Sequence, residues 1–251
     1  MDIFTKKPGE PQSSLAEAAG LSWLREASPA AVARVISVDA HHISTARVEP
    51  TRPTPAAART AGRELARIHL AGAPAFGAPP AGWEGPNYIG TQRQECTPVE
   101  RWSDFYSGQR VLPFAHHAYR RSHLSADGLH TVQVACRLLR QLDVTVPPAR
   151  LHGDLGNGNL LFGTEGPVMI DPAAHGGHPE TDLAMLALFG APFLEEIRAG
   201  YEEINPLESG WVEWTPLHQL HPLAVHAASH GPAYGVALIE AAEATITLLD
   251  G

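Results

Sequence analysis

Three oxygen-bearing side chains stand at a fixed spacing in the second half of the chain. Asp154 is followed five positions later by Asn159, and Asp171 comes twelve positions after Asn159. A carboxylate beside an acceptor hydroxyl can take up its proton, while carboxylate and carboxamide oxygens are ligands that Mg²⁺ prefers. An Asp-x-x-x-x-Asn segment, a hairpin and a second Asp form the arrangement found in sites that transfer a phosphoryl group from ATP. The spacing therefore predicts a phosphotransferase site that uses ATP and Mg²⁺.

The residues between these three side chains have the composition needed to bring them together. Gly153, Gly156 and Gly158 allow a tight turn beside a ligand. Two short apolar pieces, 159–162 and 167–170, are separated by a Gly-Thr-Glu-Gly segment, which predicts a hairpin. Any of the three polar residues alone would more often form a turn, so the shared spacing carries the prediction.

Several segments of the chain resemble one known family. The resemblance lies in His-Gly-Asp-Leu at 152–155, Gly-Asn at 158–159, Ile-Asp-Pro-Ala at 170–173 and Glu-Thr-Asp-Leu-Ala-Met at 180–185, with further matches at 16–18, 65–69, 76–77, 87–91 and 102–110. These segments are similar to the fructosamine kinase (ketosamine 3-kinase) family, which has a protein-kinase-like and aminoglycoside-phosphotransferase-like fold. The resemblance implies an α+β, two-lobe fold with a truncated β-rich N-lobe and a mainly helical C-lobe.

The resemblance also implies roles for individual residues. Asp154 would be the general base, and Asn159 and Asp171 would be the Mg²⁺ ligands. Lys6 would bind the α- and β-phosphates of ATP, and Glu17 would be its partner on the following helix. Strand alternation favours Lys6 over its neighbour as this lysine, because Lys6 shares a face with the apolar residue two positions before it.

Two of these positions have simpler alternatives, and one further segment has an implied role. Lys6 could be an ordinary solvated lysine. Glu17 stands three residues after Ser14, as in a capping box at a helix start. The segment Arg47, Val48 and Glu49 falls where the hinge of the family would meet adenine, mainly through backbone groups.

The expected elements divide the chain near a group of prolines at 50, 53 and 55. Residues 1–50 are predicted to form the small N-lobe, with a strand at 3–6, a helix from residue 14, and strands at 32–39 and 42–48. Residues 51–251 are predicted to form the C-lobe, with helices at 56–70, 102–117 and 131–142, a long loop at 72–98, and helix breaks at Pro206, Pro216 and Gly231.

The chain departs from the family pattern at two places. The strand that carries Lys6 begins at the first residues, so the glycine-rich turn that normally covers the phosphates is missing from the sequence. We therefore expect a three-stranded N-lobe with an open nucleotide site, or a true start upstream of residue 1. Gly156 stands where the family usually has a tryptophan, which alters the acceptor pocket.

Composition excludes several other classes of protein. The formal net charge of −9 disfavours nucleic acid as a partner. Cys96 and Cys136 are too few and too far apart for a disulfide framework, which fits a reducing cytoplasm. We expect no signal peptide and no membrane span, because the longest apolar stretch, 183–194, is short. The oligomeric state is left open.

Other polar residues are interpreted as structural. Asp182 is expected to brace the backbone of the catalytic loop or to cap a helix, and His152 to hydrogen-bond the same loop. His226 and His230 would share a helical face, as zinc ligands can, but no third ligand stands at a recognisable spacing, so we interpret them as surface or core residues.

Three functional hypotheses follow. The leading one is an ATP-dependent kinase for a sugar hydroxyl of a ketosamine, either fructosamine or ribulosamine, free or protein-bound. The second keeps the chemistry and changes the acceptor to an aminoglycoside-like, choline-like or other small molecule. The third is a catalytically weak, nucleotide-binding pseudokinase, motivated by the missing glycine-rich turn.

Overall fold

The computed structural model describes residues 2–10 and 12–250. The chain forms two compact units. The first contains Met1–Pro98 and Pro147–Leu207, and the second contains Val99–Val146 and Glu208–Gly251. This division does not coincide with the predicted lobes, because the first unit groups the first 50 residues with the segment that carries Asp154. The lobe assignment 1–50 and 51–251 stays a prediction.

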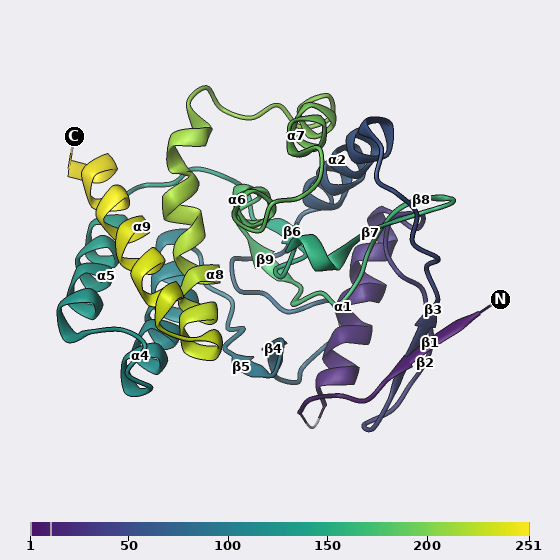
Figure 1. The fold of residues 1–251 in the computed structure, drawn as a ribbon, viewed down its shortest axis with the longest axis horizontal. Helices are drawn as coiled ribbons and strands as arrows, with labels where there is room; N and C mark the ends of the chain where they lie inside the picture. The colour runs from purple at the N-terminus through teal and green to yellow at the C-terminus, as the bar shows by residue number, and fades with distance from the viewer. Residues whose placement is uncertain (1, 11, 251) are drawn as a thin grey trace. The chain divides into compact units, whose positions relative to one another are not determined.

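A three-stranded antiparallel sheet opens the first unit (Figure 1). Its strands, in spatial order, are β1 (Ile3–Lys6), β3 (Ile43–Ala46) and β2 (Val35–Val38). Helix α1 (Ser13–Ala27) packs against β2 and β3. The second and third strands are shorter than predicted. One reason is that Val32 leaves the sheet to form an isolated bridge with Met169.

The predicted capping box at the start of α1 is wrong. The helix begins at Ser13, and the Ser14 side chain donates a hydrogen bond to the Asp39 carbonyl at 2.6 Å. The Glu17 carboxylate pairs with Lys6 at 2.9 Å. Both side chains thus find partners distant in sequence, and these partners replace the local cap.

Helix α2 (Pro55–Leu70) follows the predicted span closely. The Thr54 hydroxyl accepts the Ala57 N–H at 3.2 Å, and the first-turn proline suits a helix start. Helix α2 packs closely on α7 (Leu194–Glu202). A Cβ on Gly62 would lie 1.9 Å from the Ile197 carbonyl oxygen, so glycine allows the two backbones to meet.

Three short antiparallel strand pairs also belong to the first unit. The predicted hairpin is present as β7 (Leu160–Gly163) and β8 (Gly166–Met169). Two pairs were not predicted, namely β4 (Asn87–Ile89) with β5 (Gln92–Gln94) and β6 (Ala149–Leu151) with β9 (His175–Gly177). The first of these occupies the predicted long loop, and strands of three residues are too short to show a clear alternation. Helix α6 (Glu180–Leu188) follows β9.

The second unit is helical. Its elements are α3 (Trp102–Phe105), the π-helix η1 (Tyr106–Val111), α4 (Leu112–Arg120), α5 (Ala126–Leu139), the short 3₁₀ helix η3 (Trp211–Trp214), α8 (Thr215–His230) and α9 (Pro232–Asp250). Helix α5 starts earlier than predicted because the Ser125 hydroxyl accepts the Gly128 N–H at 3.0 Å. Pro216 lies in the first turn of α8, which begins at Thr215, whereas a helix break was predicted at this proline. Gly231 does separate α8 from α9.

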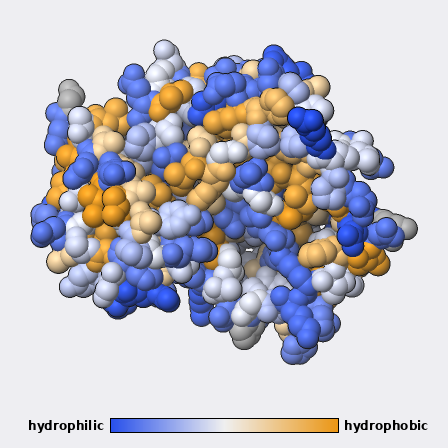
Figure 2. Space-filling view, in the orientation of Figure 1, coloured by the Kyte–Doolittle hydropathy of each residue, from blue (hydrophilic) through white to orange (hydrophobic). Residues whose placement is uncertain are grey.

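Helix α9 is long and apolar enough to cross a membrane by length and composition, which the sequence analysis did not anticipate. Figure 2 shows hydrophobic residues over α9. Within the second unit α9 packs against α5 and α8. Its buried residues form one helical stripe, Gly235, Leu238, Ala241, Ala242 and Thr245, and the carboxylates Glu240 and Glu243 are exposed. Because carboxylates are costly within a bilayer, this pattern fits a helix of a soluble bundle.

Candidate active site

A buried carboxylate holds the backbone of the loop at 152–159, which carries Asp154 and Asn159. Asp182, on α6, accepts the N–H groups of His152 at 2.8 Å and Gly153 at 2.9 Å, and it is 1% exposed. The His69 ring lies 3.1 Å from the same carboxylate. Burial by itself would raise the pKa of Asp182, but His69 and the backbone donors outweigh it, so the pKa is lowered. Asp182 therefore braces the loop as an ionised carboxylate.

This brace extends to two further helices. The second ring nitrogen of His69 lies 2.8 Å from the Tyr201 hydroxyl, which also accepts a hydrogen bond from the Asn205 amide at 2.9 Å. One arrangement satisfies all the groups: Asn205 donates to Tyr201, Tyr201 to His69, and His69 to Asp182. Sequence analysis missed Tyr201 and Asn205, because no local pattern connects residues more than 100 positions apart.

His152 ties the loop to the end of the hairpin. Its Nδ1 accepts the Asp154 N–H at 3.3 Å, which leaves Nε2–H to donate to the Ile170 carbonyl at 2.9 Å. Burial lowers the pKa of His152, which favours this neutral form. Gly153 has a φ of +79°, and a Cβ there would lie 2.4 Å from the Ala173 carbonyl oxygen. The loop therefore requires glycine at this position.

The five residues predicted for catalysis, metal binding and phosphate binding line one pocket of about 250 Å³. They are Lys6, Glu17, Asp154, Asn159 and Asp171. The Asn159 amide donates to the Asp154 carbonyl at 2.7 Å and lies 3.3 Å from its carboxylate. The Lys6 ammonium lies 2.9 Å from Glu17 and 2.8 Å from Asp171. Asp171 has a φ of +54°, a conformation that aspartate tolerates better than most residues.

The charges in this pocket perturb one another. Burial, assisted by the nearby Asp171 carboxylate, raises the pKa of Asp154 to about 7. Burial also raises the pKa of Glu17 to about 7, against the opposing effect of Lys6. Burial lowers the pKa of Lys6, but Glu17 and Asp171 outweigh it, so the net shift is upward and the ammonium stays charged. Perturbed carboxylates of this kind are typical of functional sites.

A second, more apolar cavity of about 270 Å³, called the slot below, lies beside this pocket, since Asp171 belongs to both linings. Asp171 lines both cavities, and the other residues of the slot are Phe4, Leu21, Ala33, Thr45, Ala46, Arg47, Val48, Pro50, Leu161 and Ile170. Of the predicted adenine segment, Arg47 and Val48 line the slot, whereas Glu49 does not. Glu49 forms an exposed ion pair with Arg47 at 2.9 Å.

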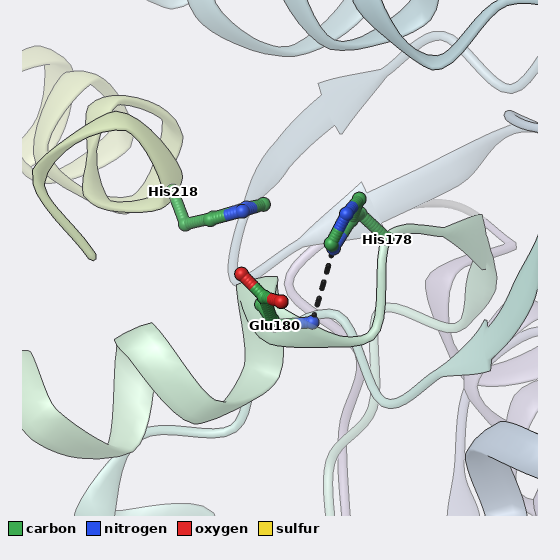
Figure 3. Close-up of side chains that lie close together, drawn as sticks. All are labelled: His178, Glu180 and His218. Atoms are coloured by element: carbon green, nitrogen blue, oxygen red, sulfur yellow. Dashed lines mark hydrogen bonds between the residues drawn. The ribbon is translucent and has the colours of Figure 1, made fainter. Parts of the chain in front are cut away.

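Histidines near the site have structural partners. His178 is buried, and its Nδ1 accepts the Glu180 N–H at 3.3 Å (Figure 3). This bond fixes the first turn of α6, which carries Asp182. In the second unit the rings of His226 and His230 stack at 5.0 Å within α8, consistent with a shared helical face.

Gly156, where the family usually has a tryptophan, lies beside the Phe189 ring. A Cβ on Gly156 would lie 3.6 Å from this ring, which is an ordinary contact distance.

The α+β fold is that of the protein-kinase-like phosphotransferases, as predicted. The model of the fructosamine kinase family matches residues 5–247. The chain therefore belongs to the fructosamine kinase family, a family of ATP-using kinases.

Individual relatives agree with this assignment. A Thermobifida fusca protein assigned as a fructosamine-3-kinase has a crystal structure that is 42% identical, with a TM-score of 0.91 over 98% of this chain and 85% of that chain. An Enterococcus faecium protein assigned as a ketoamine kinase is 34% identical over 68% of this chain, and the match spans only 61% of that protein's length. The aminoglycoside phosphotransferase APH(4)-Ia, solved with ADP and hygromycin B, shares the fold at 13% identity, with a TM-score of 0.62 over 98% of this chain and 93% of that chain.

Proposed function

We propose that this kinase transfers the γ-phosphoryl group of ATP to a sugar hydroxyl of a ketosamine, either fructosamine or ribulosamine, free or protein-bound. The observation that carries the proposal is the convergence of Lys6, Asp154, Asn159 and Asp171 on one pocket. Membership of the fructosamine kinase family and the similarity to the Thermobifida fusca protein support the class of acceptor.

In this proposal the nucleotide occupies both cavities. The apolar slot receives adenine, with the backbone of Arg47 and Val48 at its edge. The phosphates of the nucleotide then extend past Asp171, which lines both cavities, and reach the Lys6 ammonium. Glu17 holds Lys6 in place through their 2.9 Å ion pair.

The donor set fits Mg²⁺. Asp171 contributes carboxylate oxygens, and Asn159 donates its amide to Asp154, so that its Oδ1 is the ligand atom. Lys6 already places a positive charge 2.8 Å from Asp171, as expected where a cation is favourable. When bound, Mg²⁺ would neutralise charge on the β- and γ-phosphates.

Asp154 is proposed as the general base. The acceptor hydroxyl oxygen forms a bond to the γ-phosphorus as the bond to the β,γ-bridging oxygen breaks, so ADP leaves. The hydroxyl proton passes to the Asp154 carboxylate. The Asn159 amide donates to the Asp154 carbonyl and the Asp154 N–H donates to His152, and these two hydrogen bonds hold residue 154 at the pocket.

The proposed activity has a direct test. We expect the protein with Mg-ATP and fructosyl-lysine to yield ADP and a phosphorylated ketosamine, detected by mass spectrometry and a coupled ADP assay. Reactions without acceptor are the control for slow ATP hydrolysis. Turnover of an aminoglycoside- or choline-like acceptor but of no ketosamine would replace the proposal with the second hypothesis. That hypothesis is motivated by Gly156, which stands where the family usually has a tryptophan. Binding of Mg-ATP without turnover of any acceptor would support the pseudokinase.

The raised pKa of Asp154 predicts the pH dependence of this reaction. Because the base must be ionised, and its pKa is about 7, kcat/KM should rise about tenfold per pH unit below pH 7 and level off above it. A rate series from pH 5 to 9 measures this. Glu17→Gln is the control, because the limb that belongs to Asp154 should survive it. A flat profile in the wild type would contradict the assignment of Asp154.

We also infer that the protein works in the cytoplasm without a nucleic-acid or membrane partner. Cys96 and Cys136 are not joined in a disulfide, which fits a reducing compartment, and the net charge of −9 disfavours polyanions.

A further inference from the structure

Two aromatic residues form one wall of the pocket that contains Asp154, and the proposed function gives them no role. Trp83 and Tyr88 line it, and both belong to the segment 72–98. Trp83 is only partly buried. Building on the proposed function, we propose that Trp83 determines acceptor specificity by holding the protonated amine of the acceptor against its indole ring.

The indole is held in place by its own loop. Its Nε1–H donates to the Pro86 carbonyl at 3.1 Å, and the backbone N–H of Trp83 donates to the Pro80 carbonyl at 3.0 Å. A Cβ on Gly85 would lie 2.2 Å from the six-membered ring, so the glycine packs directly on the indole. The ring is therefore oriented before any ligand binds, which lowers the entropic cost of binding. Since its N–H is already used, the indole offers the pocket its carbon surface.

The wall is also fixed relative to the catalytic groups. The Asn87 side-chain amide donates to the Ala174 carbonyl at 2.8 Å, and its Oδ1 accepts from the Gln94 side chain at 3.1 Å. Asn87 is 4% exposed. Ala174 is three positions after Asp171, so the hairpin β4–β5 is bonded to the segment that carries the proposed metal ligand. Trp83 and Asp154 thus line one pocket, and the hairpin that follows Trp83 is hydrogen-bonded to the segment that follows Asp171.

The chemistry of this wall favours a cation. The face of an aromatic ring attracts ammonium groups, and tryptophan does so most strongly. Three carboxylates, Glu17, Asp154 and Asp171, line the pocket against two lysines, which disfavours an anionic acceptor. In a ketosamine the amine is two carbons from the hydroxyl on carbon 3, so an acceptor positioned at Asp154 keeps its amine inside the pocket. The amine therefore distinguishes the acceptor from a neutral sugar of equal size.

A pair of matched ligands tests this selection. N-methyl fructosamine carries a protonated amine, and its N-acetyl counterpart keeps the same hydroxyl groups without the charge. Dissociation constants for both are measured by calorimetry with Mg-ADP present. We expect Trp83→Leu to weaken binding of the amine about tenfold while the amide changes less than about twofold. Trp83→Phe should retain most of the preference for the amine.

A second variant keeps Trp83 but displaces its indole ring. Gly85→Ala places a methyl group where the indole lies, so it should reduce the preference for the amine as Trp83→Leu does. Phe193→Leu, at an exposed aromatic residue outside the pocket lining, should leave both ligands unaffected.

Three results would overturn the inference. Equal weakening of both ligands in Trp83→Leu would show an apolar platform without amine selection. An unchanged affinity for the amine in this variant, with ketosamine phosphorylation intact, would refute the role of Trp83 and leave the proposed function standing. A wild-type protein that neither binds nor phosphorylates the amine would refute both.

Discussion

Asp154→Asn is expected to lower kcat by about 10³-fold or more, while the dissociation constant for Mg-ATP changes little. The carboxamide has nearly the same shape as the carboxylate but cannot take up the hydroxyl proton. The backbone of residue 154 still accepts the Asn159 amide and donates to His152, so the loop should keep its conformation. Steady-state kinetics with the ketosamine and calorimetry with Mg-ATP together measure the effect.

A matched control uses the same chemical change elsewhere. Glu165→Gln alters an exposed carboxylate in the turn of the β7–β8 hairpin and should leave kcat unchanged. Wild-type turnover in Asp154→Asn would refute the general-base role. Loss of Mg-ATP binding in the variant would instead show that Asp154 supports the nucleotide site.

Asp182→Ala is expected to lower the free energy of unfolding by about 3–5 kcal/mol. The substitution leaves the N–H groups of His152 and Gly153 and the His69 ring without their acceptor in a buried site. Buried donors without a partner are costly, and here three lose theirs together. Urea unfolding monitored by circular dichroism measures the change.

The same carboxylate predicts how this loss varies with pH. The pKa of Asp182 is lower in the folded protein than its ordinary value of 3.8. Its contribution to stability is therefore fully present above about pH 4 and is lost as pH falls through the folded pKa. The difference in the free energy of unfolding between wild type and Asp182→Asn should shrink below pH 4.

A control variant removes a carboxylate on the surface. Glu195→Ala, at an exposed ion pair with Arg198, should lower the free energy of unfolding by less than about 1 kcal/mol. A loss that small in Asp182→Ala would contradict the bracing role.

Local patterns were sufficient for much of the fold. The strand with Lys6, the helix at 55–70 and the β7–β8 hairpin all formed where they were predicted. Each is specified by residues close in sequence, such as the Thr54 cap and the glycines at both ends of the hairpin turn. The predicted capping box at Ser14 failed because distant partners took over both side chains.

The sequence by itself determined the convergence of Asp154, Asn159 and Asp171, because these residues are close in sequence and one loop and one hairpin bring them together. Only the tertiary structure decided what surrounds them. The brace through His69, Asp182 and Tyr201 joins three helices, and the wall with Trp83 is held by a bond from Asn87 to Ala174. Such contacts depend on packing between elements far apart in the chain, which leaves no periodic or local signal in the sequence.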